Sequence, residues 1–372
     1  MQQLKDDRTI PTLAHHFDVE NAENSARLLL NHFRPHLSQQ LKEEKLIITE
    51  FTGGVQNKTL AVYFPSDRRN KTLIKVYGAD TDRILDRAGE IRTRLMLNEH
   101  ECCGKVYGLF ENGMCYEFVA GQTMTFENVG NDHCSRLIIR KLVDLHCVNR
   151  TASEDELQVF DAFKKMSGFL ELVPEAYKDE KQQRQFVEYY PNRDIFAKEI
   201  EILREHLTDS SIHSPKVFCH NDLAYGNIVY DKEKDCANFI DFEYAGLNHQ
   251  AYDIANHFNE FAGVEEYDYR RLPSRDFQIS WLTEYLKCWN KVDCSAGHSN
   301  DEAAVTDQQV QSLYFIVRKF ALVSHLFWTL WSLTQVGHSE IDFDYLRYGK
   351  QRFDEYNRSK PETLSMKNVS FP

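Results

Sequence analysis

Short apolar runs bounded by turn-forming residues predict β-strands in the first third of the chain. The runs occupy residues 46–51, 59–64, 72–77, 105–110 and 114–119. A Thr-Gly-Gly turn separates the first two runs. The last two flank Asn112-Gly113, a dipeptide that favours a tight hairpin. The pattern therefore predicts a small lobe that is rich in β-sheet.

Two helices are predicted to accompany these strands. The first lies within residues 1–45 and ends near Pro35, which is a common helix stop. Its helical spacing is carried by Leu28, Leu29, His32 and Phe33. The second helix covers residues 82–99 and is charged and amphipathic. Its predicted apolar face consists of Ile84, Ile91, Leu95 and Met96.

After Gly121 the apolar residues follow helical spacing. The clearest helical faces are formed by Leu137, Ile138, Leu142 and Leu145, and by Ile200, Leu203 and Leu207. Three short runs interrupt the helical region and predict strands at 216–219, 227–230 and 237–240. Helices return over 250–357, apart from a polar insertion at 291–308 that we expect to be a loop.

These elements predict an α+β protein with two lobes. We assign residues 46–120 to a β-rich N-terminal lobe and residues 121–372 to a mainly helical C-terminal lobe. Residues 1–45 precede them as a leader and one helix. No internal repeat or low-complexity tract is visible, so a repeat architecture is not expected.

Composition narrows the class of function. The 372 residues include 57 Asp and Glu against 44 Lys and Arg, a formal net charge of −13, which disfavours nucleic-acid binding and docking on an acidic membrane. The most apolar stretch, 320–333, is too short and too polar to span a membrane. The charged N-terminus does not match a signal peptide. The nine cysteines include no CxxC pair. We therefore expect a cytoplasmic protein with reduced thiols.

The candidate chemistry lies around the strands at 227–230 and 237–240. The polar turn between them predicts an antiparallel hairpin, in which the start of the first strand lies beside the end of the second. This arrangement brings Asn227 close to Asp241, with Asp222 on the preceding loop. Asn and Asp oxygens suit Mg²⁺ shared with substrate phosphates, and Asp222 can accept a proton from a hydroxyl. The alternative is that Asp222 and Asn227 only cap turns.

The N-terminal strands carry a candidate nucleotide site. We expect a turn at Gly53, Gly54 and Asn57 whose backbone N–H groups can cover ATP phosphates. The alternative is an ordinary hairpin turn without a ligand. Lys75 lies within the third strand and Glu90 on the following helix. Kinases use such a Lys–Glu pair to orient phosphates, although either residue alone is more typical of a solvated surface charge.

A hinge is predicted where the two lobes join. The backbone of Glu117 and Val119, within the segment 116–120, would pair with adenine. The order of Gly turn, Lys, Glu, Asp-x4-Asn and Asp matches the kinase arrangement of these groups. This order, more than any single residue, favours an ATP-dependent phosphotransferase.

The chain resembles the choline/ethanolamine kinase family from about residue 45 to 357. The most specific segments are 220–230, 239–263 and 319–335. Residues 112–118 and 341–348 are more similar to ethanolamine kinases than to choline kinases. The resemblance implies a protein-kinase-like bilobal fold, with Asp222 as the catalytic base and Asn227 and Asp241 as the Mg²⁺ ligands. Relatives commonly have Arg where this chain has Lys75.

The resemblance also places Glu260, Trp328 and Trp331 in an amine pocket, with Tyr244 as a weaker candidate. A carboxylate and aromatic faces suit a small cation. The two tryptophans share a helix face, but this helix is apolar nearly all round, so simple core packing is an equal alternative. Asp253 and His220 are interpreted as residues that hold the catalytic loop in place.

We expect an ethanolamine kinase that uses Mg²⁺ and ATP to make phosphoethanolamine, the first step of the CDP-ethanolamine route to phosphatidylethanolamine. The enzyme alternatives are a choline kinase, a dual-specificity enzyme and an aminoglycoside-type phosphotransferase. The non-enzyme alternative is a catalytically silent kinase-like scaffold. The choice of ethanolamine over choline depends on the resemblance. Homodimers occur in the family, and the sequence leaves the oligomeric state open.

Overall fold

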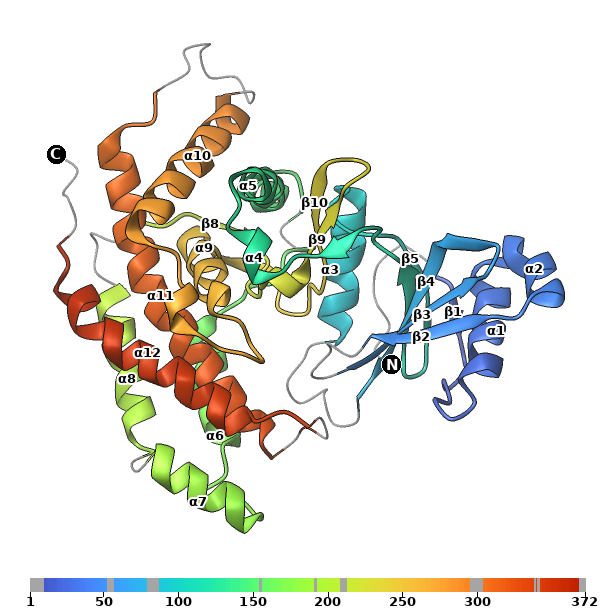
Figure 1. Ribbon diagram of the computed structural model, residues 1–372, viewed down its shortest axis with the longest axis horizontal. Helices are drawn as coiled ribbons and strands as arrows, with labels where there is room; N and C mark the ends of the chain where they lie inside the picture. Colours follow the sequence, from blue (N-terminus) through green and yellow to red (C-terminus); the bar gives the residue numbers. More distant parts are fainter. Residues whose placement is uncertain are drawn as a thin grey trace. The chain divides into compact units, whose positions relative to one another are not determined.

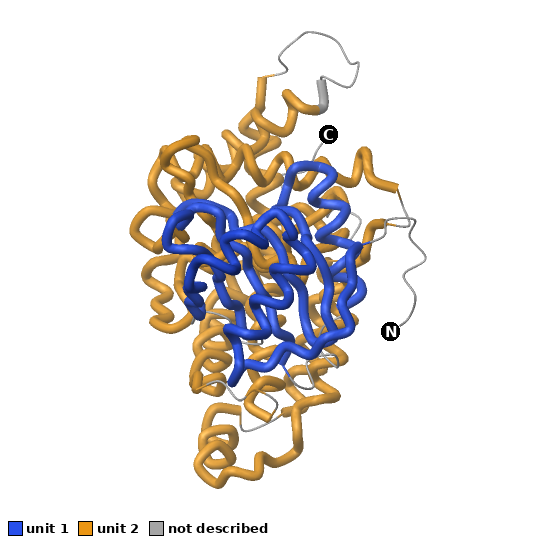
Figure 2. The backbone as a smooth tube through the Cα atoms, turned by 90° about the vertical axis from the view of Figure 1, so that its right-hand side faces the viewer, with its two compact units in different colours: residues 1–121 blue, residues 122–372 orange. Residues whose placement is uncertain are grey.

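The chain divides into two compact units, residues 1–121 and 122–372 (Figure 2). The computed structural model describes residues 10–51, 57–78, 87–153, 156–190, 193–207, 213–294, 304–337, 339 and 342–367. The predicted turn at Gly53 and Gly54 and the first residues of the 82–99 helix lie outside the described residues.

Unit 1 is built on a six-stranded sheet in the order β1-β5-β6-β4-β3-β2 (Figure 1). Its strands are β1 (Thr12–Leu13), β2 (Ile47–Phe51), β3 (Asn57–Phe64), β4 (Asp67–Tyr77), β5 (Val106–Phe110) and β6 (Gly113–Glu117). Only β1 and β5 pair in parallel; the other neighbours are antiparallel. All five predicted strands are present. β4 begins earlier than predicted because Phe64 pairs with Asp67 across a tight turn.

Two helices, α1 (Ala22–Phe33) and α2 (Ser38–Glu43), precede the main strands of unit 1. The predicted helix is confirmed as α1, which ends before Pro35. Its Leu29 and Leu30 are buried in one apolar cluster with residues from β3, β4 and β5. Burial of this apolar face against the sheet stabilises a helix that is too short to form alone.

Helix α3 (Arg87–Glu99) follows β4, and its predicted apolar face is correct at Met96, which is buried, but wrong at two other residues. Ile91 and Leu95 are only half-buried, whereas Glu90 is buried. Glu90 points inward because it forms an ion pair with Lys75 of β4. An interaction with a residue on another element therefore sets the orientation of this helix, which a pattern of apolar residues does not reveal.

Unit 2 is mainly helical. Its α-helices are α4 (Phe126–Val129), α5 (Asp132–His146), α6 (Ala162–Leu172), α7 (Glu180–Tyr189), α8 (Ile195–Leu207), α9 (Gln250–Asn259), α10 (Arg275–Cys294), α11 (Asp307–Gln335) and α12 (Tyr345–Ser365). Helix α11 packs against α12, α9, α6 and α10, which makes it the centre of the unit (Figure 1). The ends of the loop predicted at 291–308 are helical, because α10 continues to Cys294 and α11 begins at Asp307; residues 295–303 lie outside the described residues.

Helix α11 is longer than the apolar stretch that the sequence suggested. It has 29 residues, and among the described helices it alone is long and apolar enough to cross a membrane. However, 89% of its most apolar window is buried inside the protein. A helix that is apolar all round and covered by its neighbours has the character of a core helix.

Two small sheets in unit 2 flank the catalytic-loop candidate. One has the order β10-β9-β7 and the other pairs β11 with β8. The strands are β7 (Gln122–Thr123), β8 (Lys216–Cys219), β9 (Ile228–Asp231), β10 (Cys236–Phe239) and β11 (Gly246–His249). The predicted antiparallel hairpin of β9 and β10 is confirmed, with Phe239 opposite Ile228. The sequence pattern did not predict β7 or β11.

Candidate active site

The loop between β8 and β9 carries the candidate base and is fixed by one buried carboxylate. Asp253, in the first turn of α9, accepts the backbone N–H of His220 at 2.8 Å and that of Asn221 at 2.7 Å. The side chain of His220 also donates from Nε2 to the carbonyl of Ile240 at 2.9 Å. These contacts confirm that Asp253 and His220 hold the loop in place.

His146 completes this support from α5. Its Nε2 lies 3.0 Å from Asp253 Oδ2, and its Nδ1 lies 2.7 Å from the hydroxyl of Tyr285. Cys219 lies close enough to His146 and Asp253 for the three to ligate a metal ion. Because both carboxylate oxygens of Asp253 already accept hydrogen bonds, we interpret this cluster as a structural brace.

Two residues of the candidate site adopt a backbone conformation that is uncommon outside glycine. Asn221 has φ of 65° and Asp241 has φ of 63°. The side chain of Asn221 compensates by donating to the carbonyl of Tyr244 at 2.9 Å and accepting from Asn248 at 2.8 Å. Such left-handed residues often cluster at functional sites, where the surrounding structure holds them in place.

Asn227 contacts Asp222 directly. Its Nδ2 donates to the backbone carbonyl of Asp222 at 2.9 Å and to Asp222 Oδ2 at 3.3 Å. Its amide oxygen accepts no hydrogen bond from the described residues. The Ile240 N–H donates to the Asn227 carbonyl at 3.0 Å, which places Asp241 beside Asn227 as the hairpin predicted.

The electrostatics of this region favour a divalent cation. Burial raises the pKa of Asp222 well above its ordinary value, and the carboxylates of Glu260, Asp241 and Glu243 raise it further. Among the stronger influences on the pKa of Asp222, only Arg352 lowers it. Converging carboxylate and amide oxygens form the hard donor set that Mg²⁺ prefers, and its charge would relieve the repulsion. Asn227 and Asp241 therefore fit the predicted metal role.

Within unit 1, Lys75 and Glu90 form the ion pair that the sequence predicted. Lys75 Nζ lies 2.8 Å from Glu90 Oε1, and Arg94 Nε and Arg87 Nη1 each approach the carboxylate at 3.5 Å. Burial alone would raise the pKa of Glu90, but these cations, Lys75 first, lower it to about 2. Three cations thus approach one carboxylate, and Glu90 holds Lys75 in a fixed direction.

The other predicted nucleotide contacts lie at strand ends of unit 1. Asn57 begins β3, where its backbone pairs with Tyr77. Glu117 ends β6, and its N–H donates to the Lys105 carbonyl at 2.8 Å. Val119 follows in the segment that leads to unit 2. The adenine-binding roles of Glu117 and Val119 stay predictions.

Glu260 is buried with a cation in unit 2. Arg352 Nη1 donates to Glu260 Oε1 at 2.6 Å, and the exposed fractions of the two side chains are 0% and 3%. The second oxygen, Oε2, accepts no hydrogen bond from the described residues. Arg352 also donates to Ser324 Oγ at 3.1 Å and approaches the hydroxyl of Tyr348 at 3.4 Å. Glu260 is thus held in position with one oxygen available.

The predicted aromatic residues lie together. The ring of Trp328 is 5.5 Å from that of Tyr244 and 5.3 Å from that of Trp331. Trp328 Nε1 donates to Asn256 Oδ1 at 2.8 Å, and Ser324 Oγ donates to the same oxygen at 2.9 Å. Because Ser324 also contacts Arg352, one chain of hydrogen bonds links Trp328 to Glu260. Both tryptophans are buried, so packing and ligand contact are compatible roles.

Sequence reasoning missed Arg352 and the tyrosines around it. Tyr267 and Tyr348 have ring centroids 6.4 Å apart, and the nearby Arg352 lowers the pKa of Asp222. Tyr348 and Arg352 lie one helical turn apart on α12, a spacing that marks one face. The burial of Glu260 in the structure is what points to Arg352, because a buried carboxylate requires a cationic partner.

Comparison with known proteins agrees with this geometry. The model of the choline/ethanolamine kinase family matches residues 48–357. The chain belongs to this family. Ethanolamine kinase 1 of Mus musculus is 36% identical over 94% of this chain and 93% of its own length. Ethanolamine kinase 2 of Homo sapiens is 39% identical over 94% and 84%.

A solved structure shows the same fold. An ethanolamine kinase of Plasmodium vivax aligns with a TM-score of 0.72 and 26% identity, covering 91% of this chain and 89% of that one. The predicted α+β, protein-kinase-like fold is therefore confirmed, with a sheet-based N-terminal unit and a mainly helical C-terminal unit.

Proposed function

We propose that this protein is an ethanolamine kinase that transfers the γ-phosphoryl group of ATP to the hydroxyl of ethanolamine. The observation that carries the proposal is the cluster of Asp222, Asn227 and Asp241 beside a buried Glu260 that Arg352 orients. It combines a base, a metal-binding pair and a carboxylate for an amine. The names of the related ethanolamine kinases support the same substrate.

Asp222 is the catalytic base of this proposal. It orients the ethanolamine hydroxyl and accepts its proton as the oxygen bonds to the γ-phosphorus, while the bond between that phosphorus and the oxygen of ADP breaks. Bound Mg²⁺, held by Asn227 and Asp241, supplies positive charge for the transferring group. Asn227 also keeps the Asp222 carboxylate in place through its Nδ2 contact at 3.3 Å.

The residues of unit 1 bind the nucleotide in this proposal. Lys75 contacts the ATP phosphates, and Glu90 fixes the direction of its side chain through the contact at 2.8 Å. Lysine acts as a point charge, so its grip is less directional than the fork of an arginine. In this proposal Gly53, Gly54 and Asn57 contact the phosphates, and residues 46–120 form the ATP-binding lobe.

Glu260 and the aromatic residues select the amine. A primary ammonium has three hydrogen-bond donors, and Glu260 Oε2 is a suitable acceptor. Trp328, Trp331 and Tyr244 supply apolar and cation-binding faces. A quaternary ammonium offers only methyl groups, so a carboxylate acceptor favours ethanolamine over choline. Choline stays the second candidate because the family contains both activities.

We place the reaction in the cytoplasm. The eight cysteines that the structure describes form no disulfide with one another, although two are adjacent at Cys102 and Cys103. Reduced cysteines in this number are typical of reducing compartments.

The proposal is tested by ADP release from the purified protein with Mg²⁺ and ATP, using ethanolamine, choline or no acceptor. We expect strong release with ethanolamine, weaker release with choline and little without an acceptor. A preference for choline would overturn the assignment of substrate. Release that is independent of both would overturn the assignment of the reaction class.

A further inference from the structure

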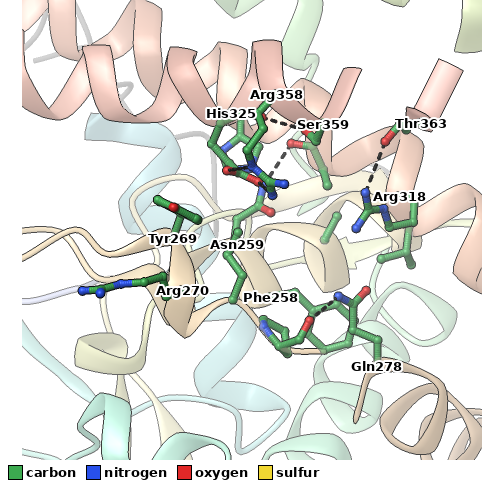
Figure 3. Close-up of a pocket in the computed structure, with 16 residues that line it drawn as sticks. Phe258, Asn259, Tyr269, Arg270, Gln278, Arg318, His325, Arg358, Ser359 and Thr363 are labelled. Atoms are coloured by element: carbon green, nitrogen blue, oxygen red, sulfur yellow. Dashed lines mark hydrogen bonds and ion pairs between the residues drawn. The ribbon is translucent and has the colours of Figure 1, made fainter. Parts of the chain in front are cut away.

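A second pocket lies in unit 2 and includes none of the candidate catalytic residues. It has a volume of about 310 Å³ and is formed by α9, α10, α11, α12 and the loop at 269–273 (Figure 3). Asp222, Asn227, Asp241 and Glu260 are not among its lining residues. Its volume lies at the lower end of the range of small-molecule sites, which begins at about 300 Å³.

Arginines dominate the charge of this pocket. Arg270, Arg318 and Arg358 line it, against one lining carboxylate, Glu355 (Figure 3). Arg358 is already paired with Glu355 through two contacts of 2.7 and 2.6 Å. Arg270 is paired in the same way with Asp268, at 2.8 and 2.7 Å. The charge of these two arginines is therefore balanced within the protein.

Arg318 differs from both. Its Nη2 donates only to the Thr363 hydroxyl, at a long 3.4 Å, and it has no carboxylate partner among the described residues. Its Nε is buried and has no acceptor there either. A buried guanidinium donor without an acceptor costs free energy, which an anion in the pocket would recover. In a chain with a net charge of −13, an unbalanced cation in a pocket is a specific feature.

His325 adds a second polar group without a partner. It lines the pocket, its side chain is 2% exposed, and its Nδ1 has no hydrogen-bond partner among the described residues. Burial lowers its pKa far below the ordinary value, and Arg352, Arg318 and Arg358 lower it further. His325 therefore presents a second buried polar group to the pocket. Its neighbours Arg352 and Arg358 are paired with Glu260 and Glu355, whereas Arg318 has no carboxylate partner among the described residues.

We propose that this pocket binds a small phosphorylated anion, at a site separate from the catalytic centre. The planar guanidinium of Arg318 matches a phosphate group, because two parallel N–H groups can contact two of its oxygens. The pocket has room for a phosphate group with a short substituent. Two sources share this chemistry: inorganic phosphate and phosphoethanolamine, of which the second depends on the proposed function.

The test measures binding by calorimetry in EDTA without nucleotide, with inorganic phosphate and phosphoethanolamine in separate titrations. We expect saturable binding of at least one of them to the wild-type protein. Arg318→Gln should weaken it at least tenfold, and Arg318→Lys should weaken it less, because lysine keeps the charge but loses the fork. Arg184→Gln, an exposed arginine of α7, is the matched control and should bind as the wild type does.

The variant Lys75→Met distinguishes binding at this pocket from binding at the proposed ATP site. It should bind both anions as the wild type does. Circular dichroism should show that Arg318→Gln is folded, because Arg318 makes a single long hydrogen bond. Binding that is lost in Lys75→Met but kept in Arg318→Gln would overturn the proposal, as would no binding of either anion. Anion binding by a protein that shows no kinase activity would leave this site intact and refute only the proposed function.

Discussion

Replacement of Arg352 by methionine tests how the amine site is held together. Arg352 is fully buried and contacts Glu260 at 2.6 Å and Ser324 Oγ at 3.1 Å. Methionine keeps an unbranched apolar side chain and removes the charge and these hydrogen bonds. The carboxylate of Glu260 then stays buried without a cation, which is more costly than the loss of the pair itself.

The expected loss follows from this geometry. Breaking a buried ion pair by removing one partner costs about 3–5 kcal/mol of unfolding free energy. The double variant Arg352→Met with Glu260→Met removes both charges, and replacing a buried pair by apolar groups is often nearly neutral. We therefore expect the double variant to be more stable than Arg352→Met alone by about 2 kcal/mol or more.

Urea unfolding followed by tryptophan fluorescence measures these differences. Arg184→Met is the control, because Arg184 and Glu180 are 73% and 91% exposed, and it should show no resolvable change. A loss below about 1 kcal/mol for Arg352→Met would refute the reasoning, because exposed pairs contribute that much. A double variant that is no more stable than the single variant would refute it equally.

Three further predictions test separate parts of the account. Asp253→Asn should reduce turnover by tenfold or more, because the backbone N–H groups of the loop lose a charged acceptor. This reduction corresponds to about 1.4 kcal/mol on the activation barrier. Steady-state turnover close to that of the wild type would contradict this prediction. Lys75→Met should raise the KM for ATP far more than the KM for ethanolamine, and equal effects would contradict the nucleotide role. His257, whose pKa burial lowers from 6.5 to about 4, should make the protein less stable as pH falls from 6.5 to 4, because the unfolded chain takes up the proton first. The loss of unfolding free energy between these pH values is about 3 kcal/mol. Urea unfolding at a series of pH values should show that the unfolding free energy depends less on pH in His257→Gln than in the wild type. The same dependence in both proteins would contradict the assignment.

The local parts of the fold were predictable from the sequence. The β9–β10 hairpin follows from two apolar runs around a polar turn, and this pairing alone places Asn227 beside Asp241. β1 and β7 are two residues long, and β11 has the sequence Gly-Leu-Asn-His with one apolar side chain, so none of them shows the apolar run that predicts a strand. The inward face of α3 was assigned correctly only in part, because Glu90 also turns inward to pair with Lys75, which lies on another element.

The buried side of the candidate site was less predictable. Arg352 and Glu260 are separated by 92 positions, and nothing near either residue in the sequence indicates the partner. The second pocket likewise combines residues from four helices. In the sequence, each of these residues has the pattern of an ordinary surface or core position. Long-range pairing of polar groups is set by tertiary packing, which periodicity does not encode.

The central claim is that Asp222 acts as the base in phosphoryl transfer to ethanolamine. The most direct measurement is ³¹P NMR of the reaction of Mg²⁺, ATP and ethanolamine with the wild-type protein and with Asp222→Ala. The account predicts that the wild type forms phosphoethanolamine and ADP in equal amounts, and that the variant is folded but slower by about 10²-fold or more. Phosphoethanolamine formed by Asp222→Ala at a rate close to that of the wild type would contradict the account.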